Sequence, residues 1–207
     1  GDEVREVLRS ASAVLVSDYG RGITGLPAIR RQLAAVAPRV PLVWDPHPRG
    51  ATPVPEARLV CPNPTEAAGF AASLGADLDD GRIDGITAAT DRAVAAEARI
   101  LRGTWRATAV AVTMGHRGAM LAEGERPPTL VAAPVVASGD SCGAGDRFAA
   151  AAVLALTRRA GVAQAVRVAV ATASAYVEAG GPAVLSTQDY VAGGPAQHQL
   201  GVYIDVE

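Results

Sequence analysis

The sequence has few of the residues from which a metal cluster or a disulfide framework is built. Its 207 residues include two cysteines, Cys61 and Cys142, which lie far apart, and only three histidines. This composition argues against a structural zinc site, and the scarcity of cysteine fits a reducing cytosol. A signal-peptide pattern and an apolar run long enough to span a bilayer are also lacking. We therefore expect a cytoplasmic protein that does not bind membranes.

A large excess of charge of either sign is lacking too. The chain has 19 Lys and Arg against 21 Asp and Glu, a net charge of −2, and its basic residues form no block. We therefore expect no nucleic-acid partner. Aromatic residues make up only 4% of the chain, so aromatic stacking should not dominate a ligand site. An anionic substrate would have to be held by a few well-placed groups.

What the sequence does have is a regular alternation of apolar strands and helices. Hydrophobic residues make up 49% of the chain and charged residues 19%, as in a packed soluble domain with a substantial core. The apolar patterns predict strands at residues 13–17, 41–44, 58–61, 108–113, 119–121 and 129–136, and helices at residues 2–10, 27–37, 64–73, 90–102, 144–159 and 162–179. This order indicates an α/β fold with a largely parallel sheet covered on both faces.

Several local features refine this outline. Thr90 is expected to cap the fourth helix, and residues 75–85, rich in Gly and Asp, are expected to form a surface loop. The last two helices are apolar almost all round, so we expect them to be buried on more than one side. Residues 202–204 are compatible with a strand, to which the sequence assigns no role.

Polar residues stand where four of the predicted strands end. They are Asp18, Asp45, Asn63 and Thr113. Ligands of parallel α/β sheets bind beyond the carboxyl ends of the strands. We therefore expect the functional site at this edge of the sheet.

The most informative segment is a glycine-rich loop that opens the fifth helix. Small residues at Gly143, Ala144 and Gly145 let successive backbone N–H groups turn inward, and the helix dipole adds to them, so the loop suits phosphate oxygens. Asp146 follows in the first helical turn, where its charge is stabilised. It would lie beside any bound phosphoryl group. A plain glycine-rich helix start, with an Asp that only favours the dipole, is the alternative, and a Walker-type motif is absent.

The sequence Asp-Ser-Cys-Gly-Ala-Gly-Asp at residues 140–146 resembles the C-terminal signature of the ribokinase/phosphofructokinase-B family of carbohydrate kinases. The resemblance implies an ATP-dependent kinase in which Asp146 is the base that activates the sugar hydroxyl. It implies that Gly143, Ala144 and Gly145 form the anion hole for the transferring phosphate. It also implies that Asp140 stands near a site for a monovalent cation such as K⁺.

Asn63-Pro-Thr-Glu66 resembles the Asn-x-x-Glu motif of the same family. That resemblance implies that Glu66, with Asn63, organises Mg²⁺ and phosphate, in part through water. Magnesium keeps several waters, so one carboxylate and one amide are sufficient. Without the resemblance, the segment is a helix begun by proline with an early Glu.

Two further segments match the family in the same order along the chain. Residues 113–118, which contain Thr113, Gly115 and Gly118, resemble the turn that borders the nucleotide, although on their own they predict only a hairpin turn. Residues 180–183, which contain Gly181, resemble the loop that closes the adenine and cation side.

The segments after the first two strands narrow the substrate class. Residues 17–22, with Asp18 and Arg21, and residues 44–50, with Asp45 and Arg49, resemble segments of the bacterial heptose 7-phosphate kinases. Those enzymes phosphorylate the anomeric hydroxyl of a phosphorylated heptose. The resemblance implies that these four residues contact the substrate, and arginine suits bidentate phosphate contact. Turn residues on a solvated rim are the alternative.

The resemblance covers residues 13–186 and implies a ribokinase-like three-layer fold. We expect residues 1–192 to form the catalytic, nucleotide-binding part, residues 193–207 a C-terminal extension, and the assembly to be a homodimer. The opening third of a usual member, with the lid sheet that covers the sugar, has no counterpart here. This predicts a fragment, or a protein that acts with another component. Three hypotheses follow: a heptose-phosphate kinase, a kinase for another sugar or a nucleoside, and a pseudokinase-like nucleotide-binding module.

Overall fold

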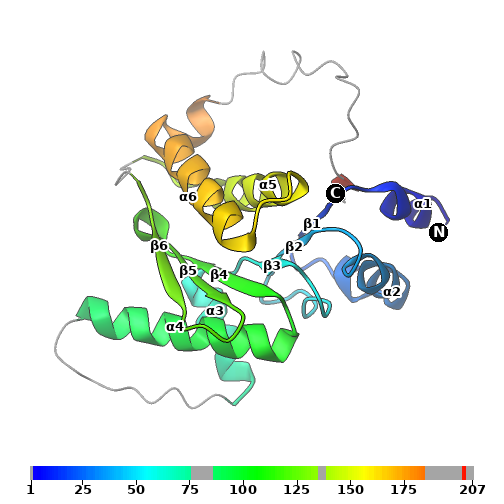
Figure 1. Ribbon diagram of the computed structural model, residues 1–207, viewed down its shortest axis with the longest axis horizontal. Coiled ribbons are helices and arrows are strands. Elements are labelled where there is room, and N and C mark those ends of the chain that lie inside the picture. Colours follow the sequence, from blue (N-terminus) through cyan, green and yellow to red (C-terminus); the bar gives the residue numbers. More distant parts are fainter. Residues whose placement is uncertain (1, 76–85, 135–138, 185–201, 204–207) are drawn as a thin grey trace.

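Figure 1 shows the computed structural model, which describes residues 2–75, 86–134, 139–184 and 202–203. Its strands are β1 (Val14–Ser17), β2 (Leu42–Asp45), β3 (Leu59–Val60), β4 (Ala109–Thr113), β5 (Gly118–Glu123), β6 (Thr129–Ala132) and β7 (Val202–Tyr203). Its α-helices are α1 (Asp2–Ser10), α2 (Pro27–Val36), α3 (Pro64–Ser73), α4 (Ile86–Trp105), α5 (Ala144–Thr157) and α6 (Val162–Glu178). Short 3-10 turns are η1 (Ile23–Gly25), η2 (Gly115–Arg117) and η3 (Gly181–Val184).

The strands form one sheet in the order β6-β5-β4-β3-β2-β1-β7. Strands β1 to β4 run parallel, and β7 pairs in parallel with β1. Strands β5 and β6 are antiparallel additions at the other edge. The predicted α/β fold with a mostly parallel sheet is therefore confirmed. No second sheet occurs among the described residues, and residues 202–203, within the predicted extension, belong to the main sheet.

Helices cover the two faces of the sheet as separate layers. Along β4, Val110 and Val112 point into a core shared with α1, α2, α3 and α4, whereas Ala109 and Ala111 point into a core shared with α5 and α6. The alternation follows from the two-residue period of a strand. Both faces of β4 are buried, which explains its continuous apolar sequence. In Figure 1, α5 and α6 lie on one side of the sheet and α4 lies on the other.

The sequence predicts α3 correctly at residues 64–73, because the two signals for its start, Pro64 and the early Glu66, are local. It misplaces the ends of α4. This helix begins at Ile86, so Thr90 lies inside it and is not its cap; the preceding alanines are good helix formers that continue the helix. At the other end α4 runs on to Trp105, which is buried and packs edge-on against Phe70 with ring centroids 5.3 Å apart. Burial of this large ring favours the extra turn.

Helices α5 and α6 are more exposed than their apolar sequences predict. Their inner residues are buried between the sheet and the partner helix. Leu154 is nevertheless 41% exposed and Val168 39% exposed. The prediction that both helices are buried on more than one side is therefore wrong for their outward stripes.

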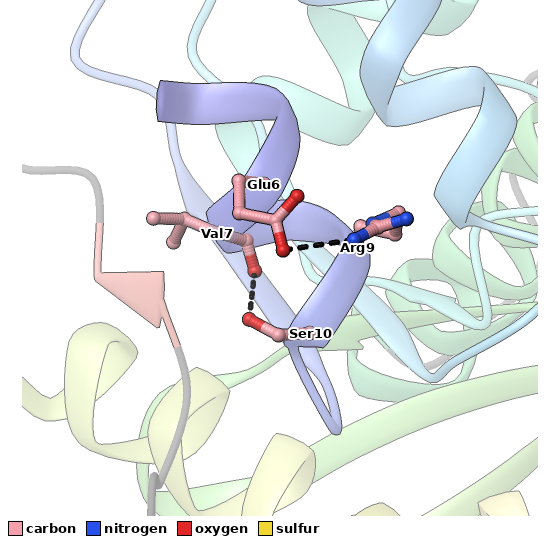
Figure 2. A network of polar contacts seen from close by, with 4 residues as sticks. All are labelled: Glu6, Val7, Arg9 and Ser10. Atoms are coloured by element: carbon pink, nitrogen blue, oxygen red, sulfur yellow. Dashed lines mark hydrogen bonds and ion pairs between the residues drawn. The ribbon is translucent and has the colours of Figure 1, made fainter. Parts of the chain in front are cut away.

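The N-terminal helix α1 is amphipathic, as predicted. Its Leu8 is buried in the core next to Val36 of α2. On the solvent side, Arg9 pairs with Glu6 at 2.9 Å, and the Ser10 hydroxyl donates to the Val7 carbonyl at 3.1 Å (Figure 2). Exposed pairs of this kind contribute little stability. Leu8, together with partly buried Val4, packs α1 against the core.

The predicted surface loop at 75–85 lies outside the described residues except for Gly75. Among the helices that the structure describes, none has the length and apolar character needed to cross a membrane.

Candidate active site

The site begins at Asp18, which directly follows β1. Asp18 is 7% exposed. One of its carboxylate oxygens accepts a hydrogen bond from the Gly20 amide at 2.8 Å; the other accepts from the Thr24 hydroxyl at 2.6 Å and the Ala51 amide at 3.2 Å. Both oxygens are therefore used within the protein. In this structure Asp18 joins the loop after β1 to the loop after β2.

Two glycines allow these loops to pack against each other. A Cβ at Gly50 would overlap the Asp18 carboxylate, and a Cβ at Gly20, which has φ +71°, would overlap the His47 ring. The loops thereby place Arg21 and Arg49 on the surface. Arg21 also lines a pocket of about 60 Å³ together with Asp18 and Tyr19. Among the described residues, neither guanidinium has a hydrogen-bond or ion-pair partner.

The glycine-rich loop forms the start of α5, as predicted. Gly143 is the N-cap residue with φ 77° and Asp146 lies in the first turn. The Ala144 amide donates to the Ser141 carbonyl at 3.0 Å, so it is occupied in this conformation. The amides of Gly143 and Gly145 have no acceptor among the described residues. In this conformation the amides of Gly143 and Gly145 remain available to an anion, whereas that of Ala144 is occupied.

Asp146 is exposed, and its Oδ1 accepts a hydrogen bond from the Tyr19 hydroxyl at 3.3 Å. This contact joins the start of α5 to the loop after β1. It brings the predicted base beside the predicted substrate segment, although the two residues are 127 positions apart in the chain.

A cluster of carboxylates surrounds the end of β2. The pKa of Asp45 is raised from its usual value near 3.8 to about 7. Burial is the largest cause, and the negative charges of Glu66, Asp146 and Asp18 add to it. Like charges disfavour ionisation only when they are close. The structure therefore gathers four of the predicted site residues from the ends of β1 and β2 and the starts of α3 and α5.

Asn63 and Glu66 form a capping box at the start of α3. The Asn63 side chain accepts from the Glu66 amide at 2.9 Å, and Glu66 Oε2 accepts from the Asn63 amide at 2.9 Å. With Pro64 at the first helical position, this is a well-defined helix start. It uses one oxygen of each side chain and leaves Glu66 Oε1 for another partner.

The turn after β4 lies beside this helix start. The Thr113 amide donates to the Pro62 carbonyl at 3.0 Å. Gly115 and Gly118 both have positive φ, and a Cβ at Gly118 would overlap the Val131 carbonyl of β6. Arg117 makes an ion pair with Asp91 of α4. The predicted hairpin turn is therefore present and anchored on both sides. None of these contacts reaches the carboxylate cluster.

Asp140 and Gly181 are brought together from either end of the α5–α6 pair. Asp140 Oδ1 accepts from the Cys142 amide at 2.9 Å. Gly181 has φ +61°, and a Cβ there would overlap the Asp140 carbonyl. The contact brings the loop before α5 against the loop after α6.

A model of the pfkB family of carbohydrate kinases matches residues 12–188. The chain belongs to this family. It is 53% identical over 184 residues to the bifunctional protein HldE of Streptomyces coelicolor, covering 89% of this chain and 36% of that protein. It is 32% identical over 194 residues to the bifunctional protein HldE of Caulobacter sp. strain K31, covering 92% and 37%. The chain thus spans little more than a third of these curated relatives.

Solved structures show the same fold. Ribokinase of Arabidopsis thaliana, complexed with ribose and ATP, superposes with a TM-score of 0.59 at 24% identity, covering 86% of this chain and 53% of that one. Ribokinase of Cryptococcus neoformans in complex with ADP gives 0.64 at 18% identity, covering 83% and 57%. Phosphofructokinase-2 of Escherichia coli with substrates and products gives 0.61 at 22%, covering 85% and 55%. The predicted ribokinase-like fold is confirmed.

In this pfkB-family member, two tyrosines belong to the site although sequence reasoning assigned them no role. Tyr19 contacts Asp146, as described above. Tyr176 of α6 donates to the Cys142 carbonyl at 3.0 Å, and its ring lies 5.1 Å from the Arg147 guanidinium carbon. Tyr19 lies within residues 17–22, the segment that resembles heptose 7-phosphate kinases, so the sequence did contain a sign that it belongs near the site. Tyr176 was not predicted, because its partner is the backbone carbonyl of Cys142 in the distant loop before α5.

Proposed function

We propose that this chain carries the phosphotransfer centre of an ATP-dependent kinase whose acceptor is a hydroxyl of a sugar or sugar phosphate. The observation that carries the proposal is the position of Asp146. It lies in the first turn of α5, directly after the free amides of Gly143 and Gly145, and close enough to Asp45 to raise its pKa. We assign the centre to residues 1–192, with a homodimer as the assembly.

The residues of this centre supply what phosphoryl transfer needs from a protein. Asp146 accepts the proton of the acceptor hydroxyl while the hydroxyl oxygen forms a bond to the γ-phosphorus and the bond to ADP breaks. The amides of Gly143 and Gly145, with the positive end of α5, hold the phosphoryl oxygens. Thr113, Gly115 and Gly118 border the nucleotide. Positioning and charge stabilisation account for most of the catalysis in reactions of this class.

The residues that we assign to a divalent cation arriving with the nucleotide act in part through water, since no group of three or more Asp, Glu, His or Cys side chains among the described residues is placed to hold a metal ion by itself. Bound Mg²⁺ neutralises charge on the phosphates and orients them. The pKa of Asp45 is raised first by burial and then by the negative charges of Glu66, Asp146 and Asp18, which therefore lie near the end of β2. Glu66 keeps Oε1 free while Oε2 caps α3, so Glu66, with Asn63, suits the role of magnesium organiser. Asp140 and Gly181, in contact through the Asp140 carbonyl, suit K⁺ on the other side of the nucleotide.

For the acceptor we propose heptose 7-phosphate, phosphorylated at its anomeric hydroxyl. Support comes from the two surface cations beside the site: Arg21 and Arg49 lack a protein partner among the described residues and stand on loops fixed by Asp18. Asp18 contributes by shaping this rim, and Asp45 faces the acceptor as a neutral or charged group depending on pH. The resemblance of both loops to heptose 7-phosphate kinases points the same way.

The test is Asp146→Asn in the longest natural protein that contains this chain, assayed with ATP and Mg²⁺. The variant should bind nucleotide as the parent does and turn over about 100- to 10,000-fold more slowly, as expected for loss of a general base. Glu125→Gln, at an exposed position of the β5–β6 turn, is the control and should be neutral. Turnover of Asp146→Asn equal to that of the parent would reject the assignment, and a parent without kinase activity would favour the nucleotide-binding module.

A further inference from the structure

The roles proposed above do not explain the hydrogen bond between Tyr19 and Asp146. The Tyr19 hydroxyl donates to Asp146 Oδ1 at 3.3 Å. This distance is longer than the usual 2.7–2.8 Å of an O–H···O hydrogen bond. Hydrogen bonds of catalytic groups are often long before substrate binds and tighten afterwards.

The backbone on both sides of Tyr19 is fixed. On one side, buried Asp18 accepts hydrogen bonds that include those of Thr24 and Ala51. On the other side, Gly20 has positive φ, donates to Asp18, and packs so closely on the His47 ring that a Cβ would overlap it. The Tyr19 side chain itself is 48% exposed. The fixed backbone and the hydroxyl contact with Asp146 therefore both contribute to its position.

The carboxylate of Asp146 needs such a partner. Asp146 is exposed in the first turn of α5, and the terminal torsion of an Asp side chain is only loosely restricted. A base must present one oxygen to the acceptor hydroxyl. A donor that occupies Oδ1 fixes the plane of the carboxylate and leaves the lone pairs of Oδ2 for the incoming proton.

We propose that Tyr19 is a positioning residue whose hydroxyl orients the Asp146 carboxylate so that Oδ2 receives the proton of the acceptor. This inference rests on the proposed function of Asp146. Tyr19 and Arg21 stand on one short loop and line the same pocket. A substrate whose distal phosphate is held by Arg21 is therefore delivered to a base that the same loop orients. The loop after β1 links substrate recognition to the chemical step.

The kinetic test is Tyr19→Phe in the same natural protein, since phenylalanine keeps the ring and removes only the hydroxyl. We expect kcat to fall roughly 10- to 150-fold, in the range for loss of one hydrogen bond to a charged group, while the KM for ATP stays the same. In an Asp146→Asn background the same change should have no further effect, because the base that Tyr19 orients is gone. A full multiplicative loss in the double variant would show a structural role and overturn the inference.

Tyr176→Phe is the matched comparison, because it also removes one phenol hydroxyl next to the glycine-rich loop. The Tyr176 hydroxyl supports the Cys142 carbonyl rather than Asp146. We therefore expect it to raise the KM for ATP and to show no special coupling to Asp146→Asn. The same pattern of effects from both tyrosines would contradict a specific role for Tyr19.

A second readout does not depend on activity. In protein labelled with ¹³C at the tyrosine ζ carbon, the Tyr19 resonance, assigned by its loss in Tyr19→Phe, should shift when Asp146 is replaced by Ala. An unmoved resonance would disprove the hydrogen bond. A moved resonance with an unchanged kcat in Tyr19→Phe would disprove the positioning role. If Asp146→Asn itself is fully active, the proposed function fails instead, so the two failures are distinguishable.

Discussion

At the scale of single residues, Asp18 and Asp45 show what a polar residue at a strand end does and does not reveal. Both follow parallel strands and both were predicted to contact substrate. The structure uses both oxygens of Asp18 to hold two loops together, whereas Asp45 stands within a carboxylate cluster that raises its pKa to about 7. Position along a strand predicts the edge of the sheet correctly. It does not predict which of the two carboxylates has both oxygens occupied by hydrogen bonds from the neighbouring loops.

The raised pKa of Asp45 makes the stability of the protein depend on pH. The folded protein holds this proton more tightly than the unfolded chain, so the stabilisation is complete below about pH 4 and is lost as the pH rises through about 7. A pKa change from 3.8 to about 7 corresponds to at most about 4 kcal/mol. We expect Asp45→Asn to be more stable than the parent at pH 8 and to lose less stability between pH 5 and pH 8.

Urea unfolding at both pH values measures this difference. Buried Glu97 also has a raised pKa, caused by its burial, so Asp45→Asn should keep part of the parent's slope. Glu97→Gln is therefore the control that separates the two groups. Parallel pH profiles for the parent and Asp45→Asn would show that Asp45 is ionised throughout and that the cluster is less crowded than its geometry indicates.

At the scale of elements, the parts that the sequence predicted well are those whose signals are local. Helix α3 begins and ends where predicted, since Asn63, Pro64 and Glu66 define its start within four positions. Helix α4 was predicted too short because its C-terminal extension depends on Trp105 packing against Phe70 of another helix. Interactions between elements leave no periodic trace in a single sequence. The same reason explains why the sequence did not predict the contact of Gly181 with Asp140.

The capping box of α3 allows the helix-starting role of Glu66 to be separated from a role with magnesium. The side-chain oxygen of a glutamine at this position can still accept from the Asn63 amide, so Glu66→Gln should leave thermal stability nearly unchanged. Loss of the negative charge should raise the Mg²⁺ concentration for half-maximal activity by roughly tenfold, as for changes next to a metal. Titration of activity against Mg²⁺ at saturating ATP measures this effect.

Asn63→Ala is the matched control for the helix start. It removes the N-cap oxygen and should cost about 1 kcal/mol of stability. A magnesium titration of Glu66→Gln that coincides with the parent's would restrict Glu66 to capping α3. A large loss of stability in Glu66→Gln would show that the charge itself holds the helix start.

At the scale of the whole molecule, the site is assembled from segments that are far apart in the chain. Strand ends and the glycine-rich loop were predictable, because parallel strands end at one edge of a sheet and a helix begins there. The contact between Tyr19 and Asp146 was not predictable, since nothing in the sequence of either segment indicates that it meets the other. Family resemblance supplied the order of the parts and the fold. What the structure adds to the choice of acceptor is chiefly that the guanidinium groups of Arg21 and Arg49 have no partner among the described residues.

Arg21→Ala tests whether the acceptor already carries a phosphate. A partly desolvated contact between arginine and phosphate is charge-assisted, and hydrogen bonds to charged groups contribute about 1.5–3 kcal/mol each. In the natural full-length protein the change should lower kcat/KM for heptose 7-phosphate by roughly ten- to a hundredfold, with little effect on an unphosphorylated analogue. Arg126→Ala, at an exposed arginine of the β5–β6 turn, should be neutral toward both.

The parent is assayed in parallel with heptose 7-phosphate, fructose phosphates, ribose and adenosine. Preference for an uncharged sugar or nucleoside, together with a neutral Arg21→Ala, would reject the heptose-phosphate acceptor while leaving the phosphotransfer centre on Asp146 intact.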